Sequence, residues 1–140
     1  MCGINGFNFQ DQDLINAMVK KTNHRGPDDS GIFSDANISL GHNRLSIIDL
    51  SLAGHQPMIS PDNNLVIIYN GEIYNFQEIK KELEAKGRIF KSKTDTEVIL
   101  LGFQEWGVKV FEKLTGIFAL AIWDKKNEAL YLARDPYGVK

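Results

Sequence analysis

The sequence predicts an α+β fold, in which antiparallel sheets pack against helices. Its apolar, strand-like stretches come in pairs joined by short turns, and its helical patterns lie between these pairs. Strands paired across tight turns are antiparallel, whereas a parallel sheet would need strict alternation of strands and helices. The 140 residues suit a single domain, and no internal repeat, low-complexity segment or linker divides them.

The first 64 residues predict one helix and three strands. Leu14, Ile15, Met18 and Val19 recur at helical spacing, and two lysines follow in the last turn, where the helix dipole favours cations. Long irregular segments within domains are usually functional or disordered. The expected elements are a strand at 4–9, a helix at 11–21, a loop at 25–31, strands at 31–34 and 38–48, and an irregular segment at 49–64.

The second half predicts three helical segments, two single strands and a strand hairpin. Ile79 and Leu83 fall on one face of a helix that Gly87 ends. Thr94 and Glu97 have the spacing of a capping box, which opens the next helix. The expected elements are a strand at 65–69 leading directly into 70–74, a helix at 76–86, a short strand at 88–91, a helix from 94 to 106, further helical turns at 108–114, and a hairpin of 117–123 with 129–133.

The composition indicates a soluble protein of a reducing compartment. The net charge is −2, which leaves no electrostatic footprint for nucleic acid or an anionic membrane. A single cysteine excludes an internal disulfide. The longest apolar run, 117–123, is too short to span a bilayer, and no basic region followed by an apolar core marks a signal peptide. We therefore expect a cytoplasmic protein without a nucleic-acid or membrane partner.

The one cysteine, Cys2, is a candidate nucleophile. Removal of Met1 would place a thiol and a free α-amine on the same residue. A thiol needs an activating base, and an α-amine titrates at about 7.7–8.0, close to working pH. The alternative is structural, because a lone cysteine near a terminus is usually a small buried apolar residue.

Several short motifs occur along the chain in a fixed order. They are Cys2-Gly3-Ile4, RGPDDSG at 25–31, HNRLSIID at 42–49, GHQP at 54–57, NGEIYN at 70–75, TDTEV at 94–98, the strand at 116–124, and RDP at 134–136. Each is weak alone, but together they resemble the glutaminase domain of the class II glutamine amidotransferases, which are N-terminal nucleophile hydrolases. The LSIID run after Arg44 and the GHQP motif are similar to the branch of glutamine-hydrolysing asparagine synthetases.

This resemblance covers residues 1–140 and implies a fold and a reaction. The implied fold has four αββα layers, with two antiparallel sheets between helices and the glutaminase site at the N-terminal end. Because the chain stops at a strand exit, we expect the domain to be incomplete at its C-terminal end. The implied reaction is hydrolysis of the glutamine side-chain amide to glutamate and ammonia through a thioester on Cys2.

The resemblance also assigns the site residues. The Asn70 side chain and the Gly71 N–H would stabilise the oxyanion, and Gly71 would let the substrate approach closely. Arg44 would grip the α-carboxylate of glutamine in a bidentate pair, and Asp95, kept ionised by the helix dipole, would bind its α-ammonium group. Other expected substrate contacts are Leu45, Ser46, Ile47, Ile48 and Glu72. Structural alternatives exist for each: a tight turn at Asn70-Gly71, an exposed arginine at a strand end, and an aspartate that only starts a helix.

The remaining motifs bear on partners and cofactors. The 25–31 stretch resembles a mobile loop over bound glutamine, with hinges at Gly26 and Gly31. The spacing of His24, His42 and His55 matches no metal site. No Ser-Gly-Gly-x-Asp-Ser run or other phosphate loop is present, so we expect no cofactor in this domain. ATP and Mg²⁺ would belong to a C-terminal synthetase domain of the same polypeptide, which receives the ammonia, and exposed edges could support a homodimer.

Two other functions remain open from the sequence. The same glutaminase could serve an amidotransferase that acts on another acceptor, such as a sugar or an antibiotic precursor, because the acceptor is chosen outside this chain. A non-catalytic domain that binds glutamine or serves as a scaffold is the second alternative. The presence of Cys2, Asn70 and Gly71 speaks against it.

Overall fold

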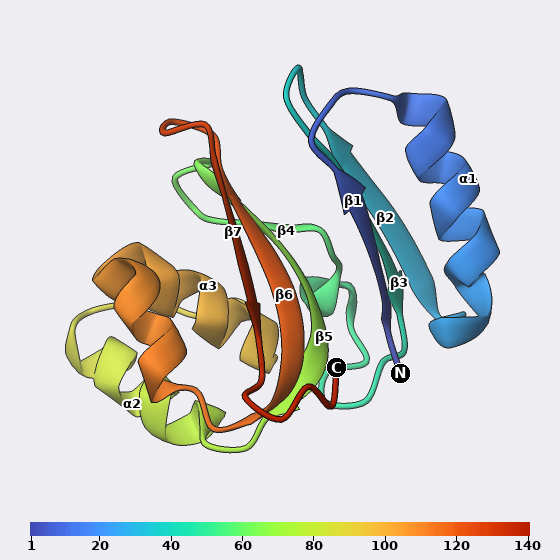
Figure 1. Cartoon of the computed structure of the whole chain (residues 1–140). Helices are drawn as coiled ribbons and strands as arrows, with labels where there is room; N and C mark the ends of the chain where they lie inside the picture. The colour runs from blue at the N-terminus through green and yellow to red at the C-terminus, as the bar shows by residue number, and fades with distance from the viewer.

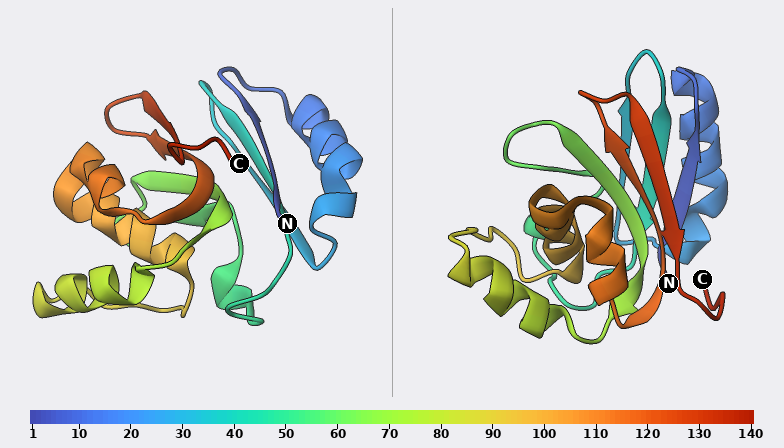
Figure 2. Two further views of the ribbon diagram at one scale, coloured as in Figure 1. Left: turned by 60° about the horizontal axis from the view of Figure 1, so that its bottom comes forward. Right: turned by 60° about the vertical axis from the view of Figure 1, so that its left-hand side comes forward.

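The computed structural model describes residues 1–140 and arranges them in four layers (Figure 1). Two antiparallel sheets face each other, α1 covers the outer face of the first, and α2 and α3 cover the outer face of the second (Figure 2). The elements are β1 (Gly3–Phe7), α1 (Gln12–Thr22), β2 (Asp29–Ser34), β3 (Ser39–Arg44), β4 (Met58–Ile59), β5 (Leu65–Ile73), α2 (Phe76–Ala85), α3 (Asp95–Trp106), β6 (Gly116–Asp124), β7 (Ala129–Arg134) and the 3-10 helices η1 (Asn23–Arg25), η2 (Leu52–Gly54) and η3 (Gly107–Lys113). The α+β, αββα prediction is confirmed.

The first sheet has the strand order β1-β3-β2. β3 pairs antiparallel with both neighbours, so that Gly3 lies opposite Asn43 and Asp29 opposite Arg44. Helix α1 packs on this sheet through Ile15, which is fully buried. The end of β3 and the start of β1 are therefore adjacent, which brings Arg44 and the residue before Gly3 to one end of the sheet.

The second sheet has the order β4-β5-β6-β7, with β5 and β6 paired from Leu65 opposite Asp124 to Ile73 opposite Gly116. Its outer face packs against α2 and α3 in the main core, which includes Ile67, Leu83 and Ile99. Its inner face meets the first sheet through a second cluster: Ile38, Leu40, Val66, Ile68, Ala121 and Trp123. Alternation along β5 thus sends even-numbered side chains toward the first sheet and odd-numbered ones toward the helices.

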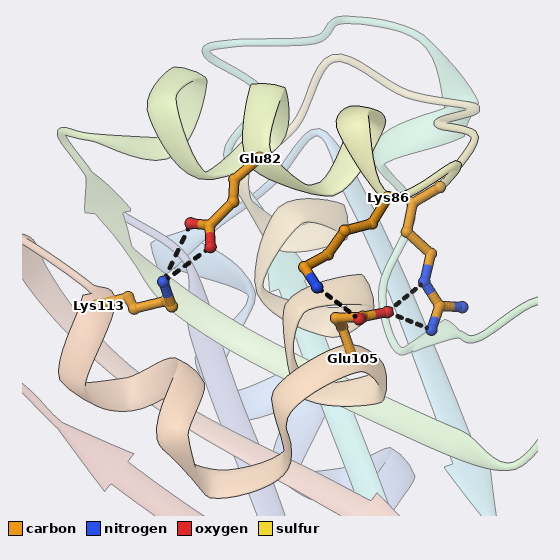
Figure 3. Close-up of polar contacts among 5 residues, drawn as sticks. Glu82, Lys86, Glu105 and Lys113 are labelled. Atoms are coloured by element: carbon orange, nitrogen blue, oxygen red, sulfur yellow. Dashed lines mark hydrogen bonds and ion pairs between the residues drawn. The ribbon is translucent and has the colours of Figure 1, made fainter.

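Ion pairs join the outer helices to one another (Figure 3). Glu105 of α3 accepts from Lys86, at the end of α2, at 3.3 Å and from Arg88 at 2.8 Å. Lys113 of η3 contacts Glu82 of α2 at 3.0 Å. These partly exposed pairs contribute little stability each, because solvent screens them. They connect the outer helices and take no part in the cavity described below.

Most predicted elements form, and the exceptions have identifiable causes. The strand expected at 38–48 ends at Arg44, because the apolar residues after it leave the sheet and Ile47 is 74% exposed. The short strand expected at 88–91 is wrong: no strand pairs with it, and the Lys91 N–H donates to the Glu97 carboxylate. Only one of the two capping-box hydrogen bonds forms. The Thr94 hydroxyl accepts from the Glu97 N–H, but the Glu97 carboxylate accepts from the Ser92 N–H in the preceding loop.

Two loop predictions also change. The 25–31 stretch, expected as a loop, contains the end of η1 and the start of β2, and both of its glycines are closely packed. A Cβ on Gly26 would collide with the Asn43 backbone, and one on Gly31 with the Gln56 carbonyl. The irregular segment at 49–64 contains η2 and β4. None of the helices has the length and apolar character that a membrane-spanning segment requires.

Candidate active site

A cavity of about 150 Å³ is lined by residues that include Met1 and Lys140, at the two ends of the chain. The two termini lie at the same end of the sheets (Figures 1 and 2). An engineered apolar cavity of this size holds one benzene-sized molecule, so the site suits a small ligand. The expected site residues that line it are Cys2, Arg44, Leu45, Ile47, Ile48, Asn70, Gly71, Glu72 and Asp95. Ser46, also an expected substrate contact, does not line the cavity, and its N–H donates to the Asp28 carboxylate at 2.7 Å.

Cys2 lies at the entrance to β1, half-buried, with its thiol facing the end of β3. The Leu45 N–H donates to Sγ over 3.4 Å, and the thiol in turn lies 3.8 Å from the Leu45 carbonyl oxygen, so the backbone after β3 holds the sulfur in place. The carbonyl oxygen of Cys2 accepts from Arg25 Nε at 3.2 Å. The backbone nitrogen of Cys2 is joined to Met1, which also lines the cavity and is 56% exposed.

The edge of β5 presents an open backbone N–H to the cavity. β4 pairs only with residues 66–67 of β5, so no strand covers the edge beyond them. Gln56 Oε1 accepts from the Tyr69 N–H at 2.7 Å, and Asp95 Oδ2 accepts from the Ile73 N–H at 3.0 Å. Alternation along a strand directs the Gly71 N–H to this same edge.

The opposite strand confirms that the Gly71 N–H is free. Gly71 lies opposite Phe118 in β6. The N–H and carbonyl of Phe118 bond to Asp135 instead, at 3.2 and 2.8 Å, so Gly71 and Phe118 form a non-hydrogen-bonded pair. The cavity therefore contains an unused N–H donor at Gly71. It lies between the N–H groups of Tyr69 and Ile73, which already have hydrogen-bond partners.

The glycine at position 71 has a different cause from the one expected. We predicted that it lets a substrate approach, but a Cβ there would collide with the Ile117 carbonyl oxygen and the Phe118 backbone of β6. Gly116, on the neighbouring strand, would likewise collide with the Glu72 carbonyl oxygen. Close approach of the two strands requires these glycines, and the open N–H is a consequence of the edge rather than of the missing side chain.

Asn70 and Glu72 face the first sheet, on the side of β5 that also carries Val66 and Ile68. Asn70 is 9% exposed, lies inside the strand and lines the cavity, so the tight-turn alternative is wrong. Glu72 is exposed at the cavity wall. The cavity thus wraps around the β5 edge, with the Asn70 amide on one face and Asp95 on the other.

Arg44 is buried at the end of β3 and holds the loop that follows it. Nη1 donates to the Ser51 carbonyl at 2.8 Å and Nη2 to the Asp49 carbonyl, and Gly54 packs against the guanidinium. The exposed-arginine alternative is therefore wrong. Two of the five N–H groups are committed to the loop, which leaves the others for a ligand in the cavity.

The same loop is fixed at its other side by α3. The Asp49 carboxylate accepts the Lys93 N–H at 3.0 Å and the Ser51 N–H at 2.9 Å, and these bonds lower its pKa to about 2. Gln56 Nε2 donates to the Thr96 hydroxyl at 3.2 Å. The loop between Arg44 and Gln56 is therefore hydrogen-bonded both to the end of β3, through Arg44, and to α3, through Thr96.

Asp95 is the first residue of α3 and is 5% exposed. Its Oδ2 accepts from the Tyr69 hydroxyl at 2.6 Å and from the Ile73 N–H at 3.0 Å. Burial raises the pKa of this carboxyl, while the hydrogen bonds from Tyr69 and Ile73 act in the opposite direction by stabilising the carboxylate. No lysine, arginine or histidine forms an ion pair with it. The cavity therefore contains a buried acid without a counter-charge.

Several cavity residues were missed by the sequence reasoning, among them Asp49, Gln56, Tyr69 and Thr96. Gln56 lies in the GHQP motif, which was a usable signal. Tyr69 reads in sequence as one more apolar strand residue, and nothing in the pattern distinguishes it. No three His, Cys, Asp or Glu side chains come together as a group of metal ligands.

Comparisons with known proteins agree with this architecture. The profile of the family described as "Glutamine amidotransferase domain" matches residues 1–140. The chain is 44% identical to asparagine synthetase [glutamine-hydrolyzing] 1 of Bacillus subtilis, covering 100% of this chain and 23% of the relative. It is 34% identical to the amidase chyE of Penicillium rubens, covering 100% of this chain and 23% of the relative.

A solved structure shares the fold. The glutamine phosphoribosylpyrophosphate amidotransferase of B. subtilis superposes with a TM-score of 0.81 at 21% identity, over 100% of this chain and 38% of that chain. The present chain thus spans about a quarter of the length of the curated relatives it matches.

Proposed function

Because this chain belongs to the family of glutamine amidotransferase domains, we propose that its cavity hydrolyses the side-chain amide of glutamine to glutamate and ammonia. One observation supports this most directly. The only cysteine, the Asn70 amide, the open Gly71 N–H and the unpaired Asp95 carboxyl all line one cavity.

The nucleophile is the Cys2 thiol after removal of Met1. The freed α-amine accepts the thiol proton, and Sγ attacks the amide carbon to form a tetrahedral intermediate. The C–N bond then breaks, the nitrogen takes a proton from the α-ammonium group, and ammonia leaves a glutamyl thioester. Water hydrolyses the thioester to glutamate and restores the thiol. Met1 lines the cavity, so its removal also enlarges the site.

The oxyanion of the intermediate is stabilised by donors that are already in place. The Gly71 N–H is fixed by the β5–β6 pairing, and the Asn70 amide lies on the adjoining face of the same strand. Preorganised donors of this kind contribute to catalysis because they need no reorganisation when charge develops.

The two charged groups of the amino acid have complementary partners in the cavity. Arg44 binds the α-carboxylate with the N–H groups that the loop leaves free, and Asp95 binds the α-ammonium group. The walls formed by Leu45, Ile47 and Ile48 enclose the substrate between them. Charge pairing in a buried site selects a zwitterion over a simple amide.

The ammonia is delivered to a synthetase domain of the same polypeptide, in which ATP and Mg²⁺ activate aspartate, and asparagine is the product. The support is the asparagine synthetase relative, of which this chain matches about a quarter. A different acceptor is the second candidate, because the relatives do not all carry the name asparagine synthetase: one of them is named an amidase. The acceptor does not change the glutaminase chemistry of the chain.

Intact mass measured before and after exposure to a diazoketone analogue of glutamine tests the proposal. We expect loss of Met1 and one stoichiometric adduct on Cys2. Added glutamine should slow the formation of this adduct, because it competes for the same cavity. A processed chain that takes no adduct and releases no ammonia from glutamine would contradict hydrolysis and favour a non-catalytic domain.

A further inference from the structure

Tyr69 is the most connected residue at the cavity wall and has no role in the chemistry proposed above. It is 3% exposed and is held through three different atoms. Its N–H donates to Gln56, its carbonyl accepts from His42 Nε2 at 3.0 Å, and its hydroxyl donates to Asp95 Oδ2 at 2.6 Å. These partners come from the loop before β4, from β3 and from α3, so the tyrosine cannot shift without breaking contacts to three elements.

The phenol keeps its proton and must donate it to the acid. Burial and the neighbouring Asp95 charge raise the pKa of Tyr69, so the hydroxyl does not ionise at working pH. A protonated phenol has one hydrogen, and here the Asp95 carboxylate receives it over a short distance.

The hydrogen bonds to Asp95 fall on one of its two oxygens. Oδ2 accepts both from the Tyr69 hydroxyl and from the Ile73 N–H, so neither of these two donors occupies Oδ1, and Asp95 lines the cavity. An unpaired buried acid gains most from a cation, because the cation replaces the solvation that burial removed. The orientation of the Asp95 carboxylate therefore determines the affinity of the cavity for a substrate that carries an ammonium group.

We infer that Tyr69 is a positioning residue for substrate specificity: its hydroxyl fixes the Asp95 carboxylate so that the cavity prefers amides that carry an α-ammonium group. The inference rests on the proposed glutaminase function. It assigns to Tyr69 no contact with the reacting amide, so the chemical step itself should be unaffected by loss of the hydroxyl.

The test compares ammonia release from L-glutamine and from 4-carbamoylbutanoate, which is glutamine without its α-amino group. The chain without Met1 is measured as wild type and as Tyr69→Phe, Asp95→Asn and the double variant. Tyr131→Phe is the matched control, because this half-buried tyrosine of β7 packs against the outer core, away from the cavity. The quantity compared is the ratio of kcat/KM for the two substrates.

We expect Tyr69→Phe to raise KM for glutamine about tenfold, the change that follows from loss of one hydrogen bond to a charged group, with kcat within about twofold. The kinetics of 4-carbamoylbutanoate should not change, so the preference for glutamine falls about tenfold. In the Asp95→Asn background the same substitution should have no further effect, because the two groups act as one unit.

Other outcomes overturn the inference. Equal losses on both substrates would show general damage to the fold, which a thermal melt of the isosteric variant would also detect. An unchanged preference in a folded Tyr69→Phe chain would show that Asp95 needs no support from Tyr69. Failure of the wild-type chain to release ammonia from glutamine would instead overturn the proposed function, and this inference with it.

Discussion

His42 Nε2 lies 3.0 Å from the carbonyl oxygen of Tyr69, and this hydrogen bond joins the two sheets where both residues are buried. A carbonyl oxygen only accepts, so the ring proton is on Nε2. The other ring nitrogen, Nδ1, is buried and has no partner. Protonation of His42 would therefore create a charged, unsatisfied N–H between the sheets, directly behind the cavity residue Tyr69.

His42 should make the fold sensitive to mild acid. Burial lowers its pKa from 6.5 to about 4. Because the unfolded chain then binds the proton more tightly than the folded one, stability is present above pH 6.5 and is lost as the pH falls toward 4. Between pH 7.5 and 5.0 the loss assigned to His42 is roughly 2 kcal/mol. Urea denaturation at both pH values should show this loss in wild type and not in His42→Gln.

The matched control is the exposed His24. The His24→Gln chain should keep the pH dependence of wild type, since all other titrating groups are shared. A His42→Gln chain that loses as much stability as wild type between the two pH values would show that the ring is not the group responsible.

Cys2 should be indispensable for ammonia release, and only when its amine is free. Replacement by alanine removes the nucleophile, and we expect the rate to fall by at least about 10³-fold. Insertion of a lysine between Met1 and Cys2 should have a similar effect, because the base is then tied up in a peptide bond. Ammonia release and alkylation of the thiol, measured together, separate a missing base from a missing nucleophile. Substantial activity in either variant would remove Cys2, or its amine, from the mechanism.

Arg44→Lys should raise KM for glutamine at least about tenfold, although the charge is kept. The guanidinium serves the Ser51 and Asp49 carbonyls with two N–H groups while it faces the cavity, and a lysine cannot supply this fork. Arg88→Lys is the control, because Arg88 pairs with Glu105 in the outer layer. An unchanged KM in the Arg44 variant would exclude this residue from substrate binding.

The sequence predicts the layers of this fold well and the details of the site less well. Periodicity is local, so the helix faces and the β6–β7 hairpin are recovered from it. The length of β4 cannot be predicted from local periodicity. β4 pairs with β5 only up to position 67, and whether the rest of the β5 edge is covered depends on the path of the loop before β4. The free Gly71 N–H and the role of Gln56 as a substitute for a strand partner follow from that path.

Electrostatic detail was also beyond the sequence pattern. The helix start at Asp95 predicts a carboxylate near the positive end of the helix dipole, but its burial, which raises its pKa, depends on the packing of Tyr69 and α3 and is not visible in the sequence. The run after Arg44 predicts a longer strand because apolar residues favour one. In the structure these residues line the cavity instead, as the resemblance to glutamine amidotransferases implied for Leu45, Ile47 and Ile48.

Asn70→Ala should lower kcat for glutamine about 10²–10³-fold, the usual cost of one oxyanion donor, with little change in KM. In the proposed mechanism the effect falls on kcat, because the Asn70 amide stabilises the developing charge, whereas Arg44 and Asp95 are the groups proposed to bind the ends of the substrate. Some activity should remain, since the Gly71 N–H is fixed by β5 and β6 and does not depend on the Asn70 side chain. Steady-state kinetics of this variant and of Asn16→Ala, on the exposed face of α1, provide the measurement and its control. A rise in KM at unchanged kcat would place Asn70 among the substrate-binding groups and leave Gly71 as the only oxyanion donor identified.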